Sequence, residues 1–234
     1  MPLPGPLKNL WRGSKGAQPP KGSPPPGSGR TSFPPRHTGD EVASTRSSRG
    51  LEEFFSYIRD QSGLTILDLG GATQQNVTFI TNLGHRLYSE DFLQILNETF
   101  GAEDTVDQAN PGRIEYFLRQ TLDYPEGQFD GVLIWDVLEY LEPALLNAVV
   151  ERLHKIARPK SYMLSFFHSD DKLNAVPFYT FRIQETNTLH VAERGLHRPT
   201  QLFNNRSLEK LFNRFESVKF FLTKERLREV IVKV

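Results

Sequence analysis

The feature that most constrains the fold is a short apolar segment that ends in an acid and two glycines, Leu64–Thr73. Its leucines and isoleucine form the continuous apolar run of a strand buried in a parallel sheet. Asp68 lies near the end of that strand, where a carboxylate can receive the hydroxyls or amine of a ligand. Gly70 and Gly71 let the backbone turn sharply and approach a ligand closely. Because open α/β sheets bind ligands at the carboxyl ends of their strands, this segment predicts a ligand-binding turn.

Apolar segments of strand and helix type alternate along the middle of the chain. Strands are predicted at 64–69, 86–89, 114–118, 129–135 and 162–167, and helices at 50–60, 74–83, 92–100 and 143–157. A further helix around 208–215 precedes two alternating segments, Ser217–Leu222 and Glu229–Val234, which predict a terminal antiparallel hairpin. Strand–helix alternation indicates a parallel sheet with right-handed crossovers. We therefore expect an α/β fold with a doubly wound, mostly parallel sheet of seven strands.

The first 49 residues differ in composition from the rest. They are rich in Pro, Gly, Ser and Arg and predict a disordered tail, with a folded domain over 50–234. The tail carries eight Lys/Arg against two acids, so of the 28 residues of each sign the domain keeps 20 basic and 26 acidic ones. This mildly acidic balance argues against nucleic acid as the partner of the domain. The alternative for the tail is a basic arm that contacts an acidic partner.

Residues 168–204 form an insertion with no clear helical pattern. Phe178–Ile183 and Leu189–Ala192 predict a small hairpin within it. An insertion after a late strand lies beside the ligand crevice, so this segment is the candidate substrate lid.

Cysteine is absent from the sequence, which excludes disulfides and thiolate zinc sites and fits a reducing compartment. No apolar run approaches the roughly 20 residues that a membrane helix needs, and the N-terminus has no apolar core of a signal peptide. We therefore expect a cytoplasmic protein without a membrane partner. No phosphate-binding P-loop, zinc spacing or Ser/His/Asp order is present, and no metal is expected.

Four segments together resemble the class I S-adenosylmethionine-dependent methyltransferases, of the Rossmann-like, small-molecule type. The first segment is similar to the first motif of that family in a degenerate form, and the second is the acid after strand two. The third is similar to the family's fourth strand and the helix start after it, and the fourth precedes strand five. These segments are Ile66–Gly71, Glu90 with Asp91, Phe129–Leu141 and Leu153–Pro159.

The resemblance implies that S-adenosylmethionine is the cofactor and assigns roles to residues. It implies that Asp68, Gly70, Gly71 and Ala72 hold the amino acid end of the cofactor, and that Glu90, with Asp91 as the alternative, accepts from the ribose hydroxyls. It likewise implies that Gln120 borders the adenine and that Trp135 and Asp136 face the transferred methyl group. The implied activity is methyl transfer to a small-molecule acceptor. No general base is assigned.

Three residues of the insertion region are candidate substrate contacts, namely His168, Tyr179 and Arg182. His168 ends the fifth strand beside Asp170 and Asp171, so this group suits either a general base or metal site, or simply a polar turn. Asp136 and Glu139 fit acids at a helix start, which the helix dipole favours.

Two other functions remain open. Ala72, Gln74 and Gln120 depart from the family pattern and favour a non-catalytic binding or scaffold protein of the same fold. A nicotinamide-dependent oxidoreductase predicts Gly-x-Gly-x-x-Gly after the first strand, and Gly70–Gln75 does not have that spacing.

Overall fold

The computed structural model describes residues 43–101, 107–169, 175–197, 199–223 and 227–234. Residues 1–42 lie outside this range, so the disordered tail stays a prediction for them. The boundary at residue 50 is wrong, because β1 (Ala43–Ser47) pairs with a later strand and α1 (Arg49–Ile58) begins one residue before it. β1 is held by backbone pairing with mostly exposed side chains, so no apolar pattern marks it in the sequence.

The centre of the fold is a six-stranded sheet in the order β3-β2-β4-β5-β9-β8. The first four strands in this order are parallel, and β9 runs antiparallel to both of its neighbours. The predicted doubly wound, mostly parallel sheet with an antiparallel C-terminal hairpin is therefore confirmed. The bounds are β2 (Thr65–Asp68), β3 (Arg86–Ser89), β4 (Phe129–Trp135), β5 (Ala157–His168), β8 (Ser217–Leu222) and β9 (Leu227–Lys233).

One predicted strand, 114–118, is helical, so among the described residues the sheet has six strands rather than seven. The segment belongs to α4 (Pro111–Thr121). Asn110 caps this helix by accepting from the amides of Gly112 and Arg113, and Pro111 occupies its first turn. α4 buries Phe117 against α3 (Phe92–Phe100). A short apolar run fits either a strand or one face of a helix, and the Asn110 cap favours the helix.

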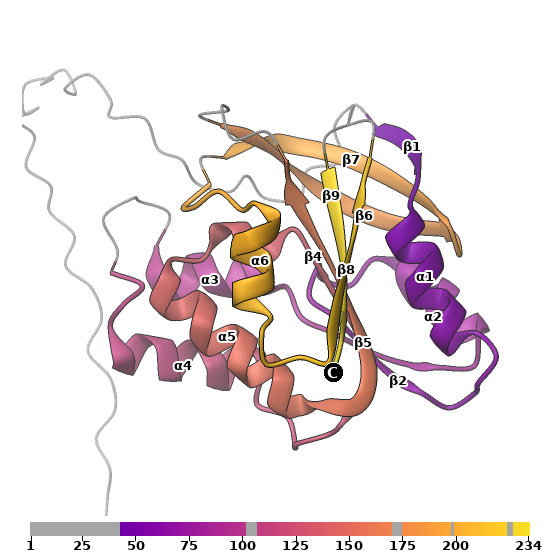
Figure 1. Ribbon diagram of the computed structural model, residues 1–234, viewed down its shortest axis with the longest axis horizontal. Coiled ribbons are helices and arrows are strands. Elements are labelled where there is room, and N and C mark those ends of the chain that lie inside the picture. The colour runs from indigo at the N-terminus through magenta and orange to yellow at the C-terminus, as the bar shows by residue number, and fades with distance from the viewer. Residues whose placement is uncertain (1–42, 102–106, 170–174, 198, 224–226) are drawn as a thin grey trace, which may run out of the picture.

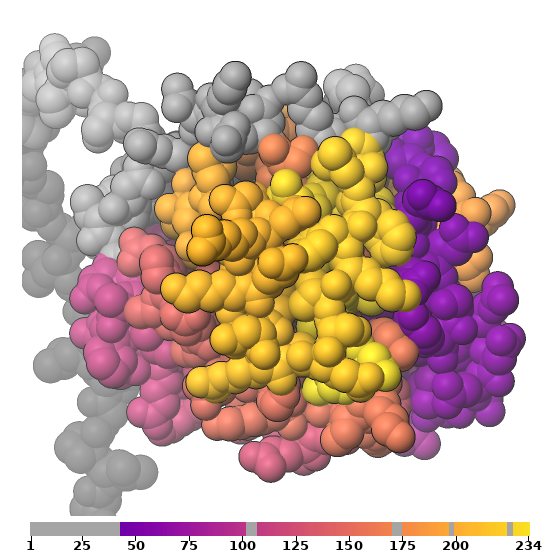
Figure 2. Space-filling model, viewed as in Figure 1, coloured from indigo at the N-terminus to yellow at the C-terminus, as the bar shows by residue number. Residues whose placement is uncertain are grey.

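Helices cover both faces of the sheet (Figure 1). α1 and α2 (Gln74–Asn82) lie on one face, and α3, α4, α5 (Pro143–Ile156) and α6 (Asn205–Leu211) lie on the other. Alternate side chains of the strands supply the two cores: Ile66 packs on the α1 side and Leu67 on the α5 side. In the space-filling view, the C-terminal segment occupies the middle of the visible face, between the α5 region and α1 (Figure 2). No helix in the described part of the chain is long and apolar enough to cross a membrane.

The insertion folds into a second sheet of three strands, β1-β7-β6. β6 (Val176–Glu185) and β7 (Thr188–His197) form the predicted hairpin, which is longer than expected and gains β1 as a third strand. The apolar residues Phe181, Ile183 and Val191 pack against the α1 side of the main sheet. The hairpin crosses above the ends of the central strands (Figure 1).

A buried acid from the far end of the chain supports the start of α1. Glu229, which is 3% exposed, accepts from the backbone N–H of Gly50 at 2.5 Å. Ser48 accepts from the N–H of Leu51 at the same helix end. The carboxylate therefore satisfies an otherwise unpaired amide and opposes the positive end of the helix dipole.

We expect Glu229→Ala to lower the free energy of unfolding by about 2–4 kcal/mol, because it leaves a buried amide without a partner. Glu229→Gln keeps an acceptor and should cost about half as much. The matched control is Glu52→Gln, which removes an exposed acid from the first turn of the same helix and should cost only a few tenths of a kcal/mol. Urea denaturation measures all three, and equal costs for Glu52→Gln and Glu229→Gln would contradict the capping role.

Candidate functional site

A cavity of about 560 Å³ opens at the carboxyl ends of β2 and β4. The chain order of the strands reverses between β2 and β4, and this switch point is where open α/β sheets bind ligands. The helix α3 and the two hairpin strands β6 and β7 supply its other walls. The cavity is lined by Leu69, Gly70, Asp91, Leu93, Gln94, Asn97, Glu98, Trp135, Asp136, Val137, Phe178, Tyr179, Thr180, Phe181 and Arg194.

Five of the residues singled out in the sequence line this cavity, namely Gly70, Asp91, Trp135, Asp136 and Tyr179. The others do not. Asp68 is fully buried, Gly71 is buried, Ala72 is exposed, and Glu90, Arg182 and His168 lie outside the lining. Gln120 is exposed on α4, where the predicted strand would have brought it to the adenine, so the structure does not support that role.

Asp68 is held entirely by protein groups. Its Oδ1 accepts from the Gly70 amide at 2.8 Å and from the indole N–H of Trp135 at 2.6 Å. Its Oδ2 accepts from the side-chain amide of Asn76 at 3.1 Å. Asp68 is 0% exposed and lies outside the cavity lining, so its direct contact with a cofactor stays a prediction. Asp68 shapes the turn by fixing Gly70 and Trp135.

Trp135 covers the glycine turn. A Cβ atom added to Gly70 would lie 2.7 Å from Cδ1 of Trp135, so only glycine permits this close approach. The indole stacks on the ring of Phe181 at 5.1 Å with the planes 6° apart, which ties the end of β4 to the hairpin. Trp135 itself has a φ of 59°, an unfavourable conformation for a bulky residue, at the register shift between β4 and β5. Such a conformation is held by its surroundings and is frequent at ligand sites.

The two adjacent acids after β3 have different surroundings. Asp91 lines the cavity and caps α3 by accepting from the Gln94 amide at 3.3 Å. The side chain of Glu90 accepts a hydrogen bond from the hydroxyl of Tyr124. Burial and the charge of Glu90 raise the pKa of Tyr124, which keeps that hydroxyl protonated as the donor. The structure therefore brings Asp91, the alternative of the pair, to the cavity.

Asn76 was missed by the sequence reasoning and joins the glycine turn to the hairpin. Its side-chain N–H₂ also donates to the carbonyl of Phe181 at 3.2 Å, and its Oδ1 accepts from the amide of Ile183 at 2.8 Å. The partners lie more than 100 residues away in the chain. The contact is therefore set by the tertiary fold, and no local signal marks it.

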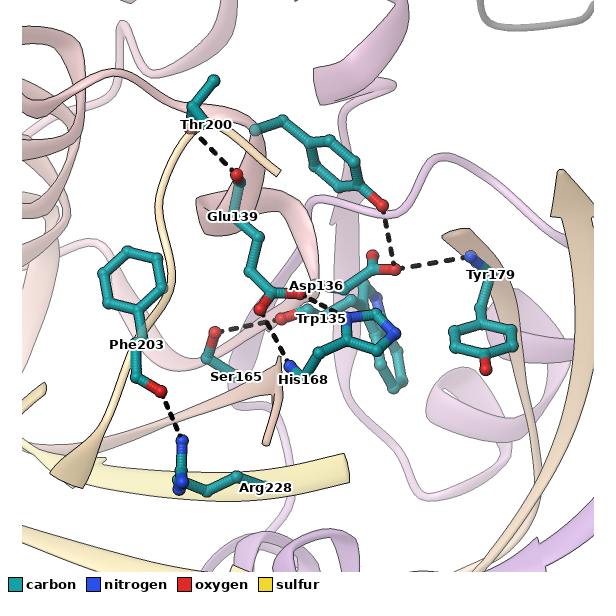
Figure 3. Close-up of polar contacts among 10 residues, drawn as sticks. Trp135, Asp136, Glu139, Ser165, His168, Tyr179, Thr200, Phe203 and Arg228 are labelled. Carbon is teal, nitrogen blue, oxygen red and sulfur yellow. Dashed lines mark hydrogen bonds and ion pairs between the residues drawn. The ribbon is translucent and has the colours of Figure 1, made fainter. Parts of the chain in front are cut away.

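A buried polar cluster lies behind one wall of the cavity (Figure 3). It contains Asp136, which follows β4, Glu139 of the short 3₁₀ helix η1 (Val137–Tyr140) and His168 at the end of β5. Both oxygens of Glu139 bind His168: Oε2 is 2.6 Å from its Nδ1, and Oε1 accepts from its backbone N–H at 2.8 Å. The Glu139 carbonyl accepts from the amide and hydroxyl of Thr200, which anchors the end of the insertion.

Asp136 is the member of the cluster that reaches the cavity. Its Oδ2 accepts from the Tyr179 amide at 3.3 Å and lies 3.4 Å from the hydroxyl of Tyr140 (Figure 3). Burial, and next the charge of Glu139, raise the pKa of Asp136 to about 7, whereas His168 opposes the rise. Burial and the charge of Asp136 also raise the pKa of Tyr140, so this phenol remains a donor.

The pairing of Glu139 with His168 was not predicted. The expectation for His168 rested on Asp170 and Asp171, which lie outside the described residues. One local signal did exist: Glu139 is an acid inside the apolar run Val137–Leu141, which is unusual for a solvated helix start. Within the described ranges, no group of three or more His, Cys, Asp or Glu side chains is arranged to hold a metal.

Comparison with known proteins gives matches only among solved structures. No family model matches the chain, and no curated protein matches it. The chain is similar to a SAM-dependent methyltransferase from Archaeoglobus fulgidus, at 15% identity over 79% of this chain and 91% of that chain, with a TM-score of 0.48. It is also similar to a 1,6-didemethyltoxoflavin-N1-methyltransferase from Burkholderia thailandensis, at 13% identity over 79% and 76% of the two chains, with a TM-score of 0.43. A third is a SAM-dependent methyltransferase from Methanosarcina mazei, at 14% identity over 74% and 93%, with a TM-score of 0.41.

Proposed function

We propose that the cavity binds S-adenosylmethionine and that the protein transfers its methyl group to a small-molecule acceptor. The observation that carries this proposal is the position of the cavity at the switch point between β2 and β4, with the Gly70 turn and the Asp91 carboxylate in its wall. Its volume of about 560 Å³ lies within the range of ordinary small-molecule sites.

The side chains around the cavity fit the chemistry of that cofactor. Asp91 offers a carboxylate to two neighbouring hydroxyls, as a ribose requires. The apolar groups of Leu93, Val137 and Phe178 suit a planar base. Arg194 presents a guanidinium to a carboxylate, and Asp136 presents an acid to cationic groups. When bound, the cofactor supplies an electrophilic methyl group on a sulfonium.

Within this proposal the chain contributes positioning and the exclusion of water, which suffice for much of the acceleration of such a reaction. Asp91 and the Gly70 turn hold one side of the site. β6 carries Phe178, Tyr179 and Phe181 over the other side and serves as the substrate lid. Asn76 holds β6 in that place through its two backbone contacts.

The second candidate function is a non-catalytic binding protein. The observation that favours it is that Trp135 covers Gly70 and donates its indole N–H to the Asp68 carboxylate. The resemblance assigns both of these residues to the cofactor. Isothermal titration calorimetry with S-adenosylmethionine and S-adenosylhomocysteine separates the two functions. Absence of heat at millimolar ligand would reject the enzyme proposal and leave the binding module.

The two adjacent acids provide a matched test of the cofactor site. Asp91→Asn should weaken S-adenosylmethionine binding about ten- to hundredfold, because a hydrogen bond to a charged group contributes about 1.5–3 kcal/mol. Asparagine still caps α3, so the fold should be kept. Glu90→Gln, one residue away and outside the cavity lining, should change the affinity less than about threefold. A larger loss for Glu90→Gln than for Asp91→Asn, by calorimetry, would show that Glu90 holds the ribose.

A further inference from the structure

Asp136 is built as a buried acid that faces a ligand site. It is 2% exposed and lines the cavity, and its Oδ2 is fixed by the Tyr179 amide and the Tyr140 hydroxyl. Those two contacts come from β6 and η1, so two separate elements hold the carboxylate. A carboxylate held in this way at a cavity wall has the geometry of a group that exchanges a proton with a ligand.

His168 is held behind Asp136 by Glu139, which contacts only one of its two ring nitrogens. Glu139 binds both the backbone N–H and Nδ1 of His168, which assigns the Nδ1 proton to the Glu139 contact. His168 is 7% exposed, and its buried Nε2 has no hydrogen-bond partner among the residues that the structure describes. Its ring lies over the ring of Tyr179 at 5.9 Å. Burying a nitrogen without a hydrogen-bond partner costs folding free energy, and functional sites retain such costly groups.

We propose, on the basis of the proposed function, that Asp136 takes the proton of an acidic hydroxyl on a planar acceptor, and that His168, held by Glu139, is the positioning residue that sets the charge of Asp136. The acceptor O–H bond breaks as its proton passes to the carboxylate. The oxygen electron pair then forms the bond to the methyl carbon, and the pair of the broken carbon–sulfur bond goes to sulfur. No other reactant is needed.

The walls of the cavity favour this acceptor class. Trp135, Phe178, Tyr179 and Phe181 place four aromatic side chains around it, which suits a flat ring. A carboxylic acid acceptor would need no base, because it is already ionised at neutral pH. An acidic hydroxyl needs a base whose own pKa lies near the working pH, and Asp136 meets that condition.

Several charged or titratable groups face this cluster and set its response to pH. The nearest are Glu139 and Tyr140 of η1, His168 of β5 and Tyr179 of β6. Arg46 of β1 lies above the Tyr179 ring, and Arg228 of β9 interacts electrostatically with Glu139. The two central partners act on Asp136 in opposite directions, since Glu139 raises its pKa and His168 lowers it. Removing Glu139 is therefore expected to lower the pKa of Asp136, and removing His168 is expected to raise it.

The first experiment measures the proton on Asp136 without any ligand. Carbon NMR of protein labelled at the aspartate carboxyls follows its titration, and Asp136→Asn identifies the resonance. Glu139→Gln should move the midpoint to lower pH and His168→Gln should move it to higher pH. The matched control is Glu229→Gln, which changes a buried acid outside the cluster and should leave the midpoint in place. Shifts of the same sign in both cluster variants, or none, would overturn the role of the pair.

The second experiment uses phenol as the acceptor probe, because its hydroxyl, like that of tyrosine, stays protonated at neutral pH. Transfer of a radiolabelled methyl group from S-adenosylmethionine measures the rate. Wild type should consume the probe with S-adenosylmethionine, at a rate that rises with pH through the Asp136 midpoint. Asp136→Asn should lose about 100-fold in rate together with that pH dependence. His168→Gln should move the midpoint of the rate profile upward, which a purely structural defect would not do.

The outcomes separate this inference from the proposed function. If calorimetry detects the cofactor but no methyl reaches phenol, the hydroxyl-acceptor inference is overturned and the proposed function stands. If Asp136→Asn keeps the wild-type rate and profile, the proton-accepting role is overturned. If no cofactor binds at all, the proposed function fails, and the NMR titration still decides whether the pair sets the charge of Asp136.

Discussion

Trp135→Ala should lower the free energy of unfolding by about 4–6 kcal/mol. Removing a buried Trp side chain costs about 3–5 kcal/mol in lost packing, and Trp135 is 1% exposed and stacked on Phe181. The variant also removes the indole N–H that donates to the buried Asp68 carboxylate, a further cost of about 1.5–3 kcal/mol that local relaxation partly offsets. Urea denaturation followed by circular dichroism measures the loss.

A double-mutant cycle separates packing from the hydrogen bond. Trp135→Phe keeps a ring against Phe181 and loses the N–H, so it should cost about 2 kcal/mol in wild type. Its cost should fall by at least half in an Asp68→Asn background, because the carboxylate that needs the donor is gone. The control is Phe166→Ala: Phe166 packs on Trp135 without binding Asp68, so its cost should be the same in both backgrounds. An unchanged cost for Trp135→Phe would contradict the proposed coupling.

The centre of the sheet was predictable because its strands carry their own apolar signal. The runs at 64–69 and 129–135 are too apolar for a surface element, and both are central strands. Residues 114–118 were not predictable in the same way, because a five-residue apolar run fits a strand or one face of a helix. The Asn110-Pro111 start of α4 was the informative signal there. β1 was missed because its side chains are mostly exposed and carry no apolar pattern, while backbone pairing with β7 holds it in the sheet.

The candidate site was predictable in its location and only partly in its contacts. The acid-then-glycine segment correctly indicated the carboxyl edge of β2, and Asp91 was named as one of two alternatives. The partners of Asp68 were not accessible, because Asn76 and Trp135 meet it only after the sheet has formed. A bulky residue at a strand end, such as Trp135, departs from the motif. It therefore indicates that a side chain of the protein itself packs against the glycine turn.

Asp136→Asn should raise the stability of the protein above neutral pH while leaving it nearly unchanged in acid. Folding raises the pKa of Asp136 from 3.8 to about 7, chiefly through burial. Between these values the folded state holds a proton that the unfolded state has released, so wild-type stability falls as pH rises from about 4 to about 7. The shift corresponds to roughly 2–4 kcal/mol, allowing for relaxation around the charge. Asparagine cannot ionise, and its Oδ1 can still accept from the Tyr179 amide, so the variant avoids this loss.

The test is the difference in unfolding free energy between Asp136→Asn and wild type, measured by urea at about pH 4.5 and about pH 8. That difference should be at most about 1 kcal/mol at the lower pH and should reach roughly 2–4 kcal/mol in favour of the variant at the higher pH. In a Glu139→Gln background the gain should shrink, because the charge of Glu139 is the second cause of the raised pKa. A gain that is independent of pH would mean that the substitution acts through packing, and the charge of Asp136 would then carry no cost in the folded protein.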